Sequence, residues 1–275
     1  MKNFLTIDLE DYYQVTGFSD VVRYDRWGTY ESRVERNTNI VLEALGDNKA
    51  TFFILGWEAE KRPGLIKKIA DAGHEIATHG RRHKLITHMN KEEFAEDMKR
   101  EVKLLEDLTG EKVLGHRAPS FSITDDTPWA FEVMADLGLK YDSSVFPIKR
   151  RHGGIPGAGM KPFSTETSAG VIYEFPLAVT DFLGKTLPVA GGGFFRLYPY
   201  WFTRRAILEN NRSDIPVVVY LHPWEFDPGQ PRLKSFFSRN GFNHYVNLNK
   251  TLKKFRKLLS DFEFIPIRNY FDENN

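Results

Sequence analysis

Short apolar runs alternate with amphipathic segments along almost the whole chain. The runs are rich in Val, Ile and Phe, and their length of about four to eight residues is typical of strands buried in a sheet. The segments between them repeat apolar residues at helical spacing. We predict strands at residues 4–10, 50–55, 74–79, 112–119, 140–146, 171–177, 216–223 and 263–267.

The clearest predicted helix covers residues 91–109. Asn90 can cap its first turn together with Glu93, apolar residues recur on one face, and Gly110 follows its last turn. Further helices are expected at about residues 37–45, 63–72, 128–137, 199–210 and 248–262.

The alternation of strands and helices favours one fold class. The chain has 275 residues, and α/β barrels commonly occupy about 250 residues as one unit. We therefore predict an α/β protein with a distorted (β/α) barrel of about seven strands, in a single domain over residues 1–275. Residues 147–170 and 223–245 are irregular and rich in Gly and Pro, and loops of this length usually cover an active site.

Composition excludes several classes of function. The net charge of +1 argues against a dedicated nucleic-acid-binding protein and against a polybasic membrane patch. The chain has no cysteine, which excludes disulfides and thiolate metal sites. The first apolar run is too short for a signal peptide, and no run reaches the roughly 20 residues of a membrane span. We expect a soluble cytoplasmic protein, with the inner face of the membrane as an alternative location.

Polar residues gather where the predicted strands end. In a (β/α) barrel the carboxyl ends of the strands meet at one rim, and that rim carries the chemistry. We therefore expect the active site there. The polar residues at or just after a strand end are Asp8, Glu10, His79, Arg117, Asp142 and His222.

His79 and His83 predict a metal site. They are four residues apart, so one helical turn or a tight loop can aim both imidazoles at the same point. A carboxylate from Asp8, Glu10 or Asp11 would complete a site of two histidines and one carboxylate, with positions open for water and substrate. Three acids so close together are costly without a cation, because like charges raise one another's pKa. The pattern is typical of a metallohydrolase; the alternative is two solvated histidines in a basic loop.

Five ordered segments resemble the motifs of one enzyme family, the polysaccharide deacetylases of the NodB-homology type, or carbohydrate esterase family four. Segments such as TFFILGW, YDSSVFP and HPWEFDPGQPRL further resemble the subgroup linked to exosortase-associated exopolysaccharide loci. The resemblance covers nearly the whole chain, and it implies subgroup-specific loops and a C-terminal extension within residues 147–275. The five segments are TIDLED (6–11), AGHEIATHG (72–80), THGRRH (78–83), RAPS (117–120) and LHP (221–223).

The resemblance implies a catalytic role for four residues. Asp8 would be the general base and His222 the general acid. Arg117 would hold Asp8 in place, and the backbone amide of Ser120 would help to bind the oxyanion.

The resemblance also implies a divalent metal, with Zn²⁺ expected first and Co²⁺, Ni²⁺ and Mn²⁺ as alternatives. His79 and His83 would be ligands. Asp-Leu-Glu-Asp replaces the family's adjacent aspartates, so the carboxylate ligand differs from the family pattern. Glu10 is preferred because it lies on the same side of the strand as Asp8, and Asp11 is the alternative.

The implied reaction is metal-dependent hydrolysis of an N-acetyl group on an N-acetylated sugar, in an exopolysaccharide or its precursor. We expect Trp224, Phe121, Asp142 and Arg196 to contact the substrate. Asp142 is also the buried acid expected to raise the pKa of His222.

Other readings of the same residues stay open. Cyclic amide hydrolases and sugar deformylases share the superfamily resemblance, and Asp-x-Glu in place of paired aspartates leaves room for them. Non-haem Fe(II) oxygenases also use two histidines and a carboxylate, but they need neither His222 nor Arg117. A catalytically dead carbohydrate-binding protein would have no need for base, acid and ligands together.

Overall fold

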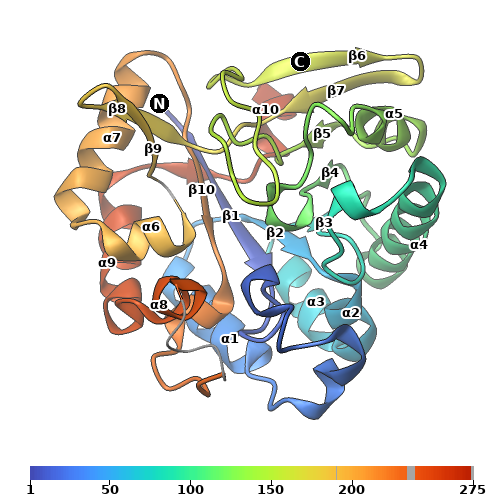
Figure 1. Ribbon diagram of the computed structural model, residues 1–275, viewed down its shortest axis with the longest axis horizontal. Helices are drawn as coiled ribbons and strands as arrows, with labels where there is room; N and C mark the ends of the chain where they lie inside the picture. The colour runs from blue at the N-terminus through green and yellow to red at the C-terminus, as the bar shows by residue number, and fades with distance from the viewer. Residues whose placement is uncertain (190, 234–238, 274–275) are drawn as a thin grey trace.

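One curled β-sheet organises the chain (Figure 1), in a computed structural model that describes residues 1–189, 191–233 and 239–273. The strand order is β10-β1-β2-β3-β4-β5-β7-β6, with β11 paired to β1, and neighbours are parallel except in the β6–β7 hairpin. An isolated parallel bridge between Leu177 and Val218 joins the segment after β7 to β10. The predicted α/β class and distorted barrel are confirmed. The strands are β1 (Asn3–Leu9), β2 (Thr51–Ile54), β3 (Glu75–Thr78), β4 (Gly115–His116), β5 (Tyr141–Asp142), β6 (Phe163–Thr167), β7 (Gly170–Glu174), β10 (Val218–Leu221) and β11 (Phe264–Ile265).

The strand β1 lies in the middle of this sheet. All its residues are buried, as expected for a parallel strand that is covered on both faces. It pairs with β10 through Phe4 and Val218, and with β2 through Thr6 and Thr51. The sheet therefore takes neighbouring strands from both ends of the chain.

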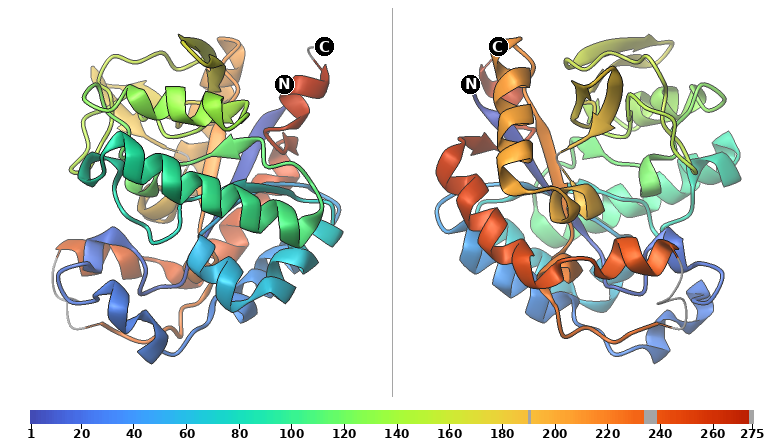
Figure 2. Two further views of the ribbon diagram at one scale, coloured as in Figure 1. Left: turned by 90° about the vertical axis from the view of Figure 1, so that its right-hand side faces the viewer. Right: turned by 60° about the vertical axis from the view of Figure 1, so that its left-hand side comes forward.

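Helices cover the outside of the sheet, and Figure 2 shows α3 beside α4 along one side of the molecule. In α4, Asn90 accepts a hydrogen bond from the Glu93 amide, and Gly110 ends the helix with a φ of 72°. The predicted caps of α4 are thus confirmed. The helices are α1 (Val34–Leu45), α2 (Gly56–Lys61), α3 (Pro63–Asp71), α4 (Lys91–Thr109), α5 (Trp129–Asp136), α6 (Gly192–Leu197), α7 (Tyr200–Arg212), α8 (Arg239–Tyr245), α9 (Leu248–Asp261) and α10 (Asn269–Glu273).

Two β-hairpins contain strands that the sequence did not predict, although β7 coincides with the strand predicted at residues 171–177. One pairs β6 with β7, and the other pairs β8 (Val179–Phe182) with β9 (Lys185–Pro188). The residues of β6 are exposed or half-buried in alternation, and its sequence, FSTET, carries little of the apolar signal of a core strand. The stretch 147–170 is therefore only partly irregular. Within the described ranges, no helix has the length and apolar character needed to cross a membrane.

Candidate active site

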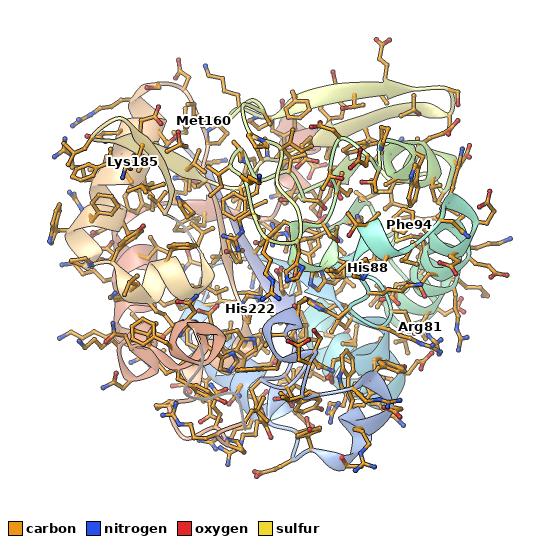
Figure 3. The ribbon with its side chains drawn as sticks, viewed as in Figure 1. Arg81, His88, Phe94, Met160, Lys185 and His222 are labelled. Carbon is orange, nitrogen blue, oxygen red and sulfur yellow. The ribbon has the colours of Figure 1, made fainter. Side chains whose placement is uncertain are left out.

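A cavity of about 780 Å³ brings together side chains that follow three strands. Asp8 lies at the end of β1, His79 directly follows β3, and His222 directly follows β10. Figure 3 shows His222 near the middle of the view, below the yellow-green loops that join β5 to β6. Of the residues predicted to form the site, those that line the cavity are Asp8, Glu10, His79, His83, Ser120, Phe121, Arg196, His222 and Trp224.

Glu10, His79 and His83 converge on one point. The Oε1 atom of Glu10 lies 3.0 Å from Nε2 of His79 and 3.0 Å from Nε2 of His83. The Nδ1 atom of His79 donates to the backbone oxygen of Arg117 at 2.7 Å. With Nδ1 engaged by this backbone oxygen, Nε2 is the ring nitrogen of His79 that faces Glu10.

These three side chains fit a divalent cation. They are at most 5% exposed, and Oε2 of Glu10 is buried without a hydrogen-bond partner among the described residues. Burial raises the pKa of Glu10, but the charge of His83 and the hydrogen bonds to His79 and His83 hold it well below its ordinary value. Two imidazole nitrogens and a buried carboxylate are the donor set that Zn²⁺ and similar cations take.

The Asp11 carboxylate binds the start of helix α1 and not the two histidines. Its Oδ2 atom accepts hydrogen bonds from the Ser32 hydroxyl at 2.7 Å and from the amides of Arg33 and Val34 at 2.7 and 3.1 Å. These amides open α1, where a carboxylate is favourable. Glu10 therefore lies beside the histidines, and Asp11 caps a helix.

Asp8 is held by a buried arginine. Oδ1 of Asp8 accepts from Nη1 of Arg117 at 2.7 Å, and Arg117 is fully buried. The other guanidinium nitrogens donate to the backbone oxygen and the hydroxyl of Ser143, at 2.9 and 2.8 Å. The second oxygen of Asp8 lies 3.8 Å from Nε2 of His222.

His222 has its own charged partner. Its Nδ1 atom lies 2.8 Å from Oε1 of Glu225, whose Oε2 accepts from Nε of Arg196 at 2.6 Å. Burial lowers the pKa of His222, but the hydrogen bond to Glu225 and the charges of Glu10 and Asp8 outweigh burial and raise it to about 9. The imidazole is thus held by Glu225 with Nε2 turned toward Asp8 and Glu10.

The expected pairing of Asp142 with His222 is wrong. Asp142 is fully buried, its Oδ1 lies 2.7 Å from Nδ1 of His116, and it does not line the cavity. Glu225 supplies the carboxylate instead, because it follows His222 by one turn of 3-10 helix in Pro223–Phe226. The three-residue spacing in HPWE is a signal that could have identified it.

Neighbouring groups hold two of the predicted substrate-contact residues, Trp224 and Arg196, in place. The Trp224 ring is stacked between His222 and His244, at centroid distances of 5.1 and 4.0 Å. Arg196 lines the cavity, but its guanidinium donates to Glu225 and to the backbone oxygens of Asn243, His244 and Val246. Arg196 therefore supports the His222 side of the site.

The Ser120 segment has an unusual backbone. Ser120 and Phe121 both lie in the left-handed region, with φ of 54° and 58°, which costs of order 1 kcal/mol or more for each such residue. Thr16, which the sequence reading did not single out, lies 2.7 Å from the Ser120 hydroxyl and 3.2 Å from Nδ1 of His83. One hydroxyl thus joins the Ser120 segment to the histidine pair.

Comparisons with known proteins match two successive parts of the chain. Residues 27–141 match the polysaccharide deacetylase family, and residues 143–272 match a domain of unknown function, DUF3473. A peptidoglycan deacetylase-like protein of Gibberella zeae is 34% identical over 106 residues, which are 38% of this chain and 30% of that protein. The peptidoglycan deacetylase of Helicobacter pylori is 33% identical over 96 residues, 35% of this chain and 32% of that protein. The chain thus spans about a third of the length of these relatives.

Solved structures share the fold. A Mycobacterium smegmatis protein described as a polysaccharide deacetylase superposes with a TM-score of 0.63 at 19% identity, over 98% of this chain and 88% of that one. An allantoinase superposes with a TM-score of 0.59 at 15% identity, over 95% of this chain and 85% of that one. The family match and the curated relatives show similarity to polysaccharide deacetylases over part of the chain, residues 27–141 in the family match. Its resemblance to the exosortase-linked subgroup stays a prediction, as does the single domain over residues 1–275.

Proposed function

We propose that the protein is a metal-dependent hydrolase that removes the acetyl group from an N-acetylated sugar of an exopolysaccharide or its precursor. The observation that carries the proposal is a carboxylate and an imidazole, Asp8 and His222, that lie 3.8 Å apart beside the Glu10, His79 and His83 cluster. A base and an acid are both needed to hydrolyse an amide. The match to the polysaccharide deacetylase family supports the same reaction.

Glu10, His79 and His83 would hold the metal, most simply Zn²⁺. When bound, such a metal polarises the substrate carbonyl and lowers the pKa of a bound water to about 7. Co²⁺, Ni²⁺ and Mn²⁺ suit imidazole and carboxylate ligands as well.

Asp8 would take the proton of the attacking water at Oδ2. Its Oδ1 atom is engaged by Arg117, which leaves Oδ2 on the cavity side beside His222. The charge-assisted hydrogen bond from the buried arginine fixes the carboxylate in orientation.

His222 would then protonate the departing nitrogen from Nε2. The carbon–nitrogen bond breaks as the new carbon–oxygen bond is kept, and the products are acetate and a free amino sugar. Protonation is required because an unprotonated amide nitrogen is a very poor leaving group. The hydrogen bond from Nδ1 to Glu225 supports this role, since it keeps the ring oriented with Nε2 toward the cavity.

The backbone amide of Ser120 would stabilise the oxyanion that forms during attack. One such donor is typically worth about 3 kcal/mol. The left-handed conformation of Ser120 supports this role, because strained backbone is frequently retained where it presents groups to a reaction.

Acetate release from N-acetylglucosamine oligomers tests the proposal. The purified protein is assayed as isolated, after chelation and after addition of Zn²⁺, together with His222→Ala. His88→Ala is the matched control, since His88 is exposed and does not line the cavity. Metal-dependent release that is lost only in His222→Ala is expected. Bound metal without acetate release would contradict the proposal and direct the search to cyclic amides or formyl groups.

A further inference from the structure

A run of four basic residues lines the candidate active-site cavity. Lys149, Arg150, Arg151 and His152 all belong to its wall, in the loop between β5 and β6. Runs of like charge ordinarily lie on solvated faces, where they repel one another. This run faces the same cavity as Asp8, and the function proposed above gives it no role.

Two glycines fix this turn against the site. A Cβ on Gly153 would overlap the backbone oxygen of Phe121, so the turn packs directly on the segment that carries Ser120. Gly154 has a φ of +87°, and a Cβ there would overlap the backbone oxygen of Ile148. The amide of Arg150 donates to the oxygen of Gly153 at 3.0 Å and closes the turn. The backbone that carries the basic side chains is therefore packed in a defined position in the cavity wall.

The guanidinium of Arg150 is positioned by aromatic rings. It lies 4.7 Å from the centroid of Phe146 and 5.8 Å from that of Phe194. Phe194 belongs to α6 and also lines the cavity. Such stacking orients a guanidinium while its N–H groups stay available for an anion.

Within residues 1–189, 191–233 and 239–273, no carboxylate forms an ion pair with Lys149, Arg150 or Arg151. Over the same ranges, the acids in the cavity wall are Asp8 and Glu10. Arg117 already binds the first of these, and two histidines contact the second.

The same charges act on His152, the histidine of this turn, where Asp20 opposes them. Burial lowers the pKa of His152, and the positive charges of Arg151, His88 and Arg150 lower it further. The wall of the cavity at this turn therefore favours a negatively charged group.

We propose that the cavity takes an N-acetylated saccharide that also carries an anionic group, a carboxylate or a phosphate ester, and that residues 149–152 bind that group. The inference rests on the deacetylase function proposed above and names the substrate class of the same cavity. Guanidinium and ammonium groups form charge-assisted hydrogen bonds with such oxyanions, which are about twice as strong as neutral ones. A neutral sugar polymer would form no charge-assisted hydrogen bond of this kind with residues 149–152.

The test compares acetate release from three N-acetylated substrates. These are neutral N-acetylglucosamine oligomers, oligosaccharides that alternate N-acetylglucosamine with glucuronate, and UDP-N-acetylglucosamine. We expect kcat/KM for one of the anionic substrates to exceed that for the neutral oligomers on the order of tenfold, and added salt to reduce the difference. The preferred anionic substrate tells whether a carboxylate or a phosphate is the recognised group.

Two double variants separate this site from general charge effects. Lys149→Gln with Arg151→Gln should lower kcat/KM for the preferred anionic substrate on the order of tenfold and leave the neutral substrate within about twofold. Lys253→Gln with Arg256→Gln removes two exposed positive charges of α9 outside the cavity and should change neither. An equal loss on neutral and anionic substrates, or a wild-type preference for the neutral oligomers, would overturn the inference.

Binding calorimetry with the same three saccharides keeps the two proposals distinguishable. If none of them releases acetate, the deacetylase function has failed for these substrates, but binding still tests the turn. Tighter binding of an anionic saccharide that weakens in the Lys149 and Arg151 variant supports the inference, and equal binding of all three contradicts it.

Discussion

The two sides of the candidate active site are built in different ways. On the metal side, His79 and His83 come from one short segment after β3, and Glu10 directly follows β1, which β2 separates from β3. On the acid side, His222 depends on Glu225, which in turn depends on Arg196. Each side joins a local pair to a distant residue, but the pair on the metal side is two imidazoles, whereas the pair on the acid side is an imidazole and the carboxylate that orients it.

The two sides also differ in what orients the imidazoles. A backbone oxygen, that of Arg117, accepts from His79, whereas a charged side chain accepts from His222. A side-chain substitution leaves the backbone oxygen that accepts from His79 in place. A substitution of Glu225 or Arg196 removes or releases the carboxylate that accepts from His222. We therefore expect all-or-none effects on the metal side and graded effects on the acid side.

Glu10→Gln should give the largest effect. Loss of the carboxylate of the Glu10, His79 and His83 cluster should remove most of the bound metal and lower kcat/KM by at least about 10³-fold, or roughly 4 kcal/mol of transition-state stabilisation. Metal content by elemental analysis and acetate release are the measurements. Full metal content with unchanged activity would show that Glu10 is not a ligand.

His222→Asn should lower kcat by about 10²- to 10⁴-fold, because the departing nitrogen loses its proton donor. Metal content should stay at the wild-type level, since the proposed ligands are Glu10, His79 and His83, and His222 belongs to a second possible metal group with Asp8 and Glu10. Simultaneous loss of the metal would mean that the two sides are not separable.

Glu225→Gln should give an intermediate effect. A lost carboxylate partner of a histidine typically costs about 10- to 100-fold, and we expect this loss in kcat with KM within about twofold. Arg196 would also lose its partner, so the free energy of unfolding should fall by about 3 kcal/mol. Rates are therefore measured well below the melting temperature. A lower melting temperature with unchanged kcat would assign Glu225 a purely structural role.

Asp11→Asn should separate stability from metal binding. The carboxylate accepts from two amides at the start of α1, so the variant should lose about 1–2 kcal/mol of unfolding free energy. Urea unfolding gives the stability, and metal content should not change. Metal loss at unchanged stability would instead favour Asp11 as the ligand.

Glu101→Gln should give the smallest effect, on stability alone. Both carboxyl oxygens of Glu101 are buried without a hydrogen-bond partner among the described residues, and burial raises its pKa well above the ordinary value. Ionisation of this group therefore favours the unfolded chain as the pH rises above about 4.5. The variant should gain about 1 kcal/mol near pH 7, with little gain near pH 4 and unchanged acetate release. Thermal melts at both pH values check the sign, and a gain that grows toward low pH would contradict it.

The sequence predicted the parts of the molecule that short-range patterns encode. The caps of α4, the apolar run of β1 and the His79–His83 spacing each lie within a few residues. The hairpin of β8 and β9 was missed because its strands carry polar and exposed residues.

The acid side was less predictable for a different reason. Asp142 ends a strand as the sequence suggested, but buried carboxylates pair with whatever side chain the fold brings near, here His116. Arg196 and Glu225 are 29 residues apart, and no local rule links them. Pairing of this kind follows from tertiary packing and not from spacing along the chain.

Because β1 lies in the middle of the sheet, the sheet can be completed only after its neighbour β10 has been synthesised. Asp8 and Glu10 are synthesised first, but β10, the neighbour that supplies Val218 and leads into His222, is synthesised more than 200 residues later. Parallel pairing across such a separation must wait for the distant strand and is intrinsically slow. A nascent chain therefore contains Asp8, the proposed base, long before His222, the proposed acid, has been synthesised.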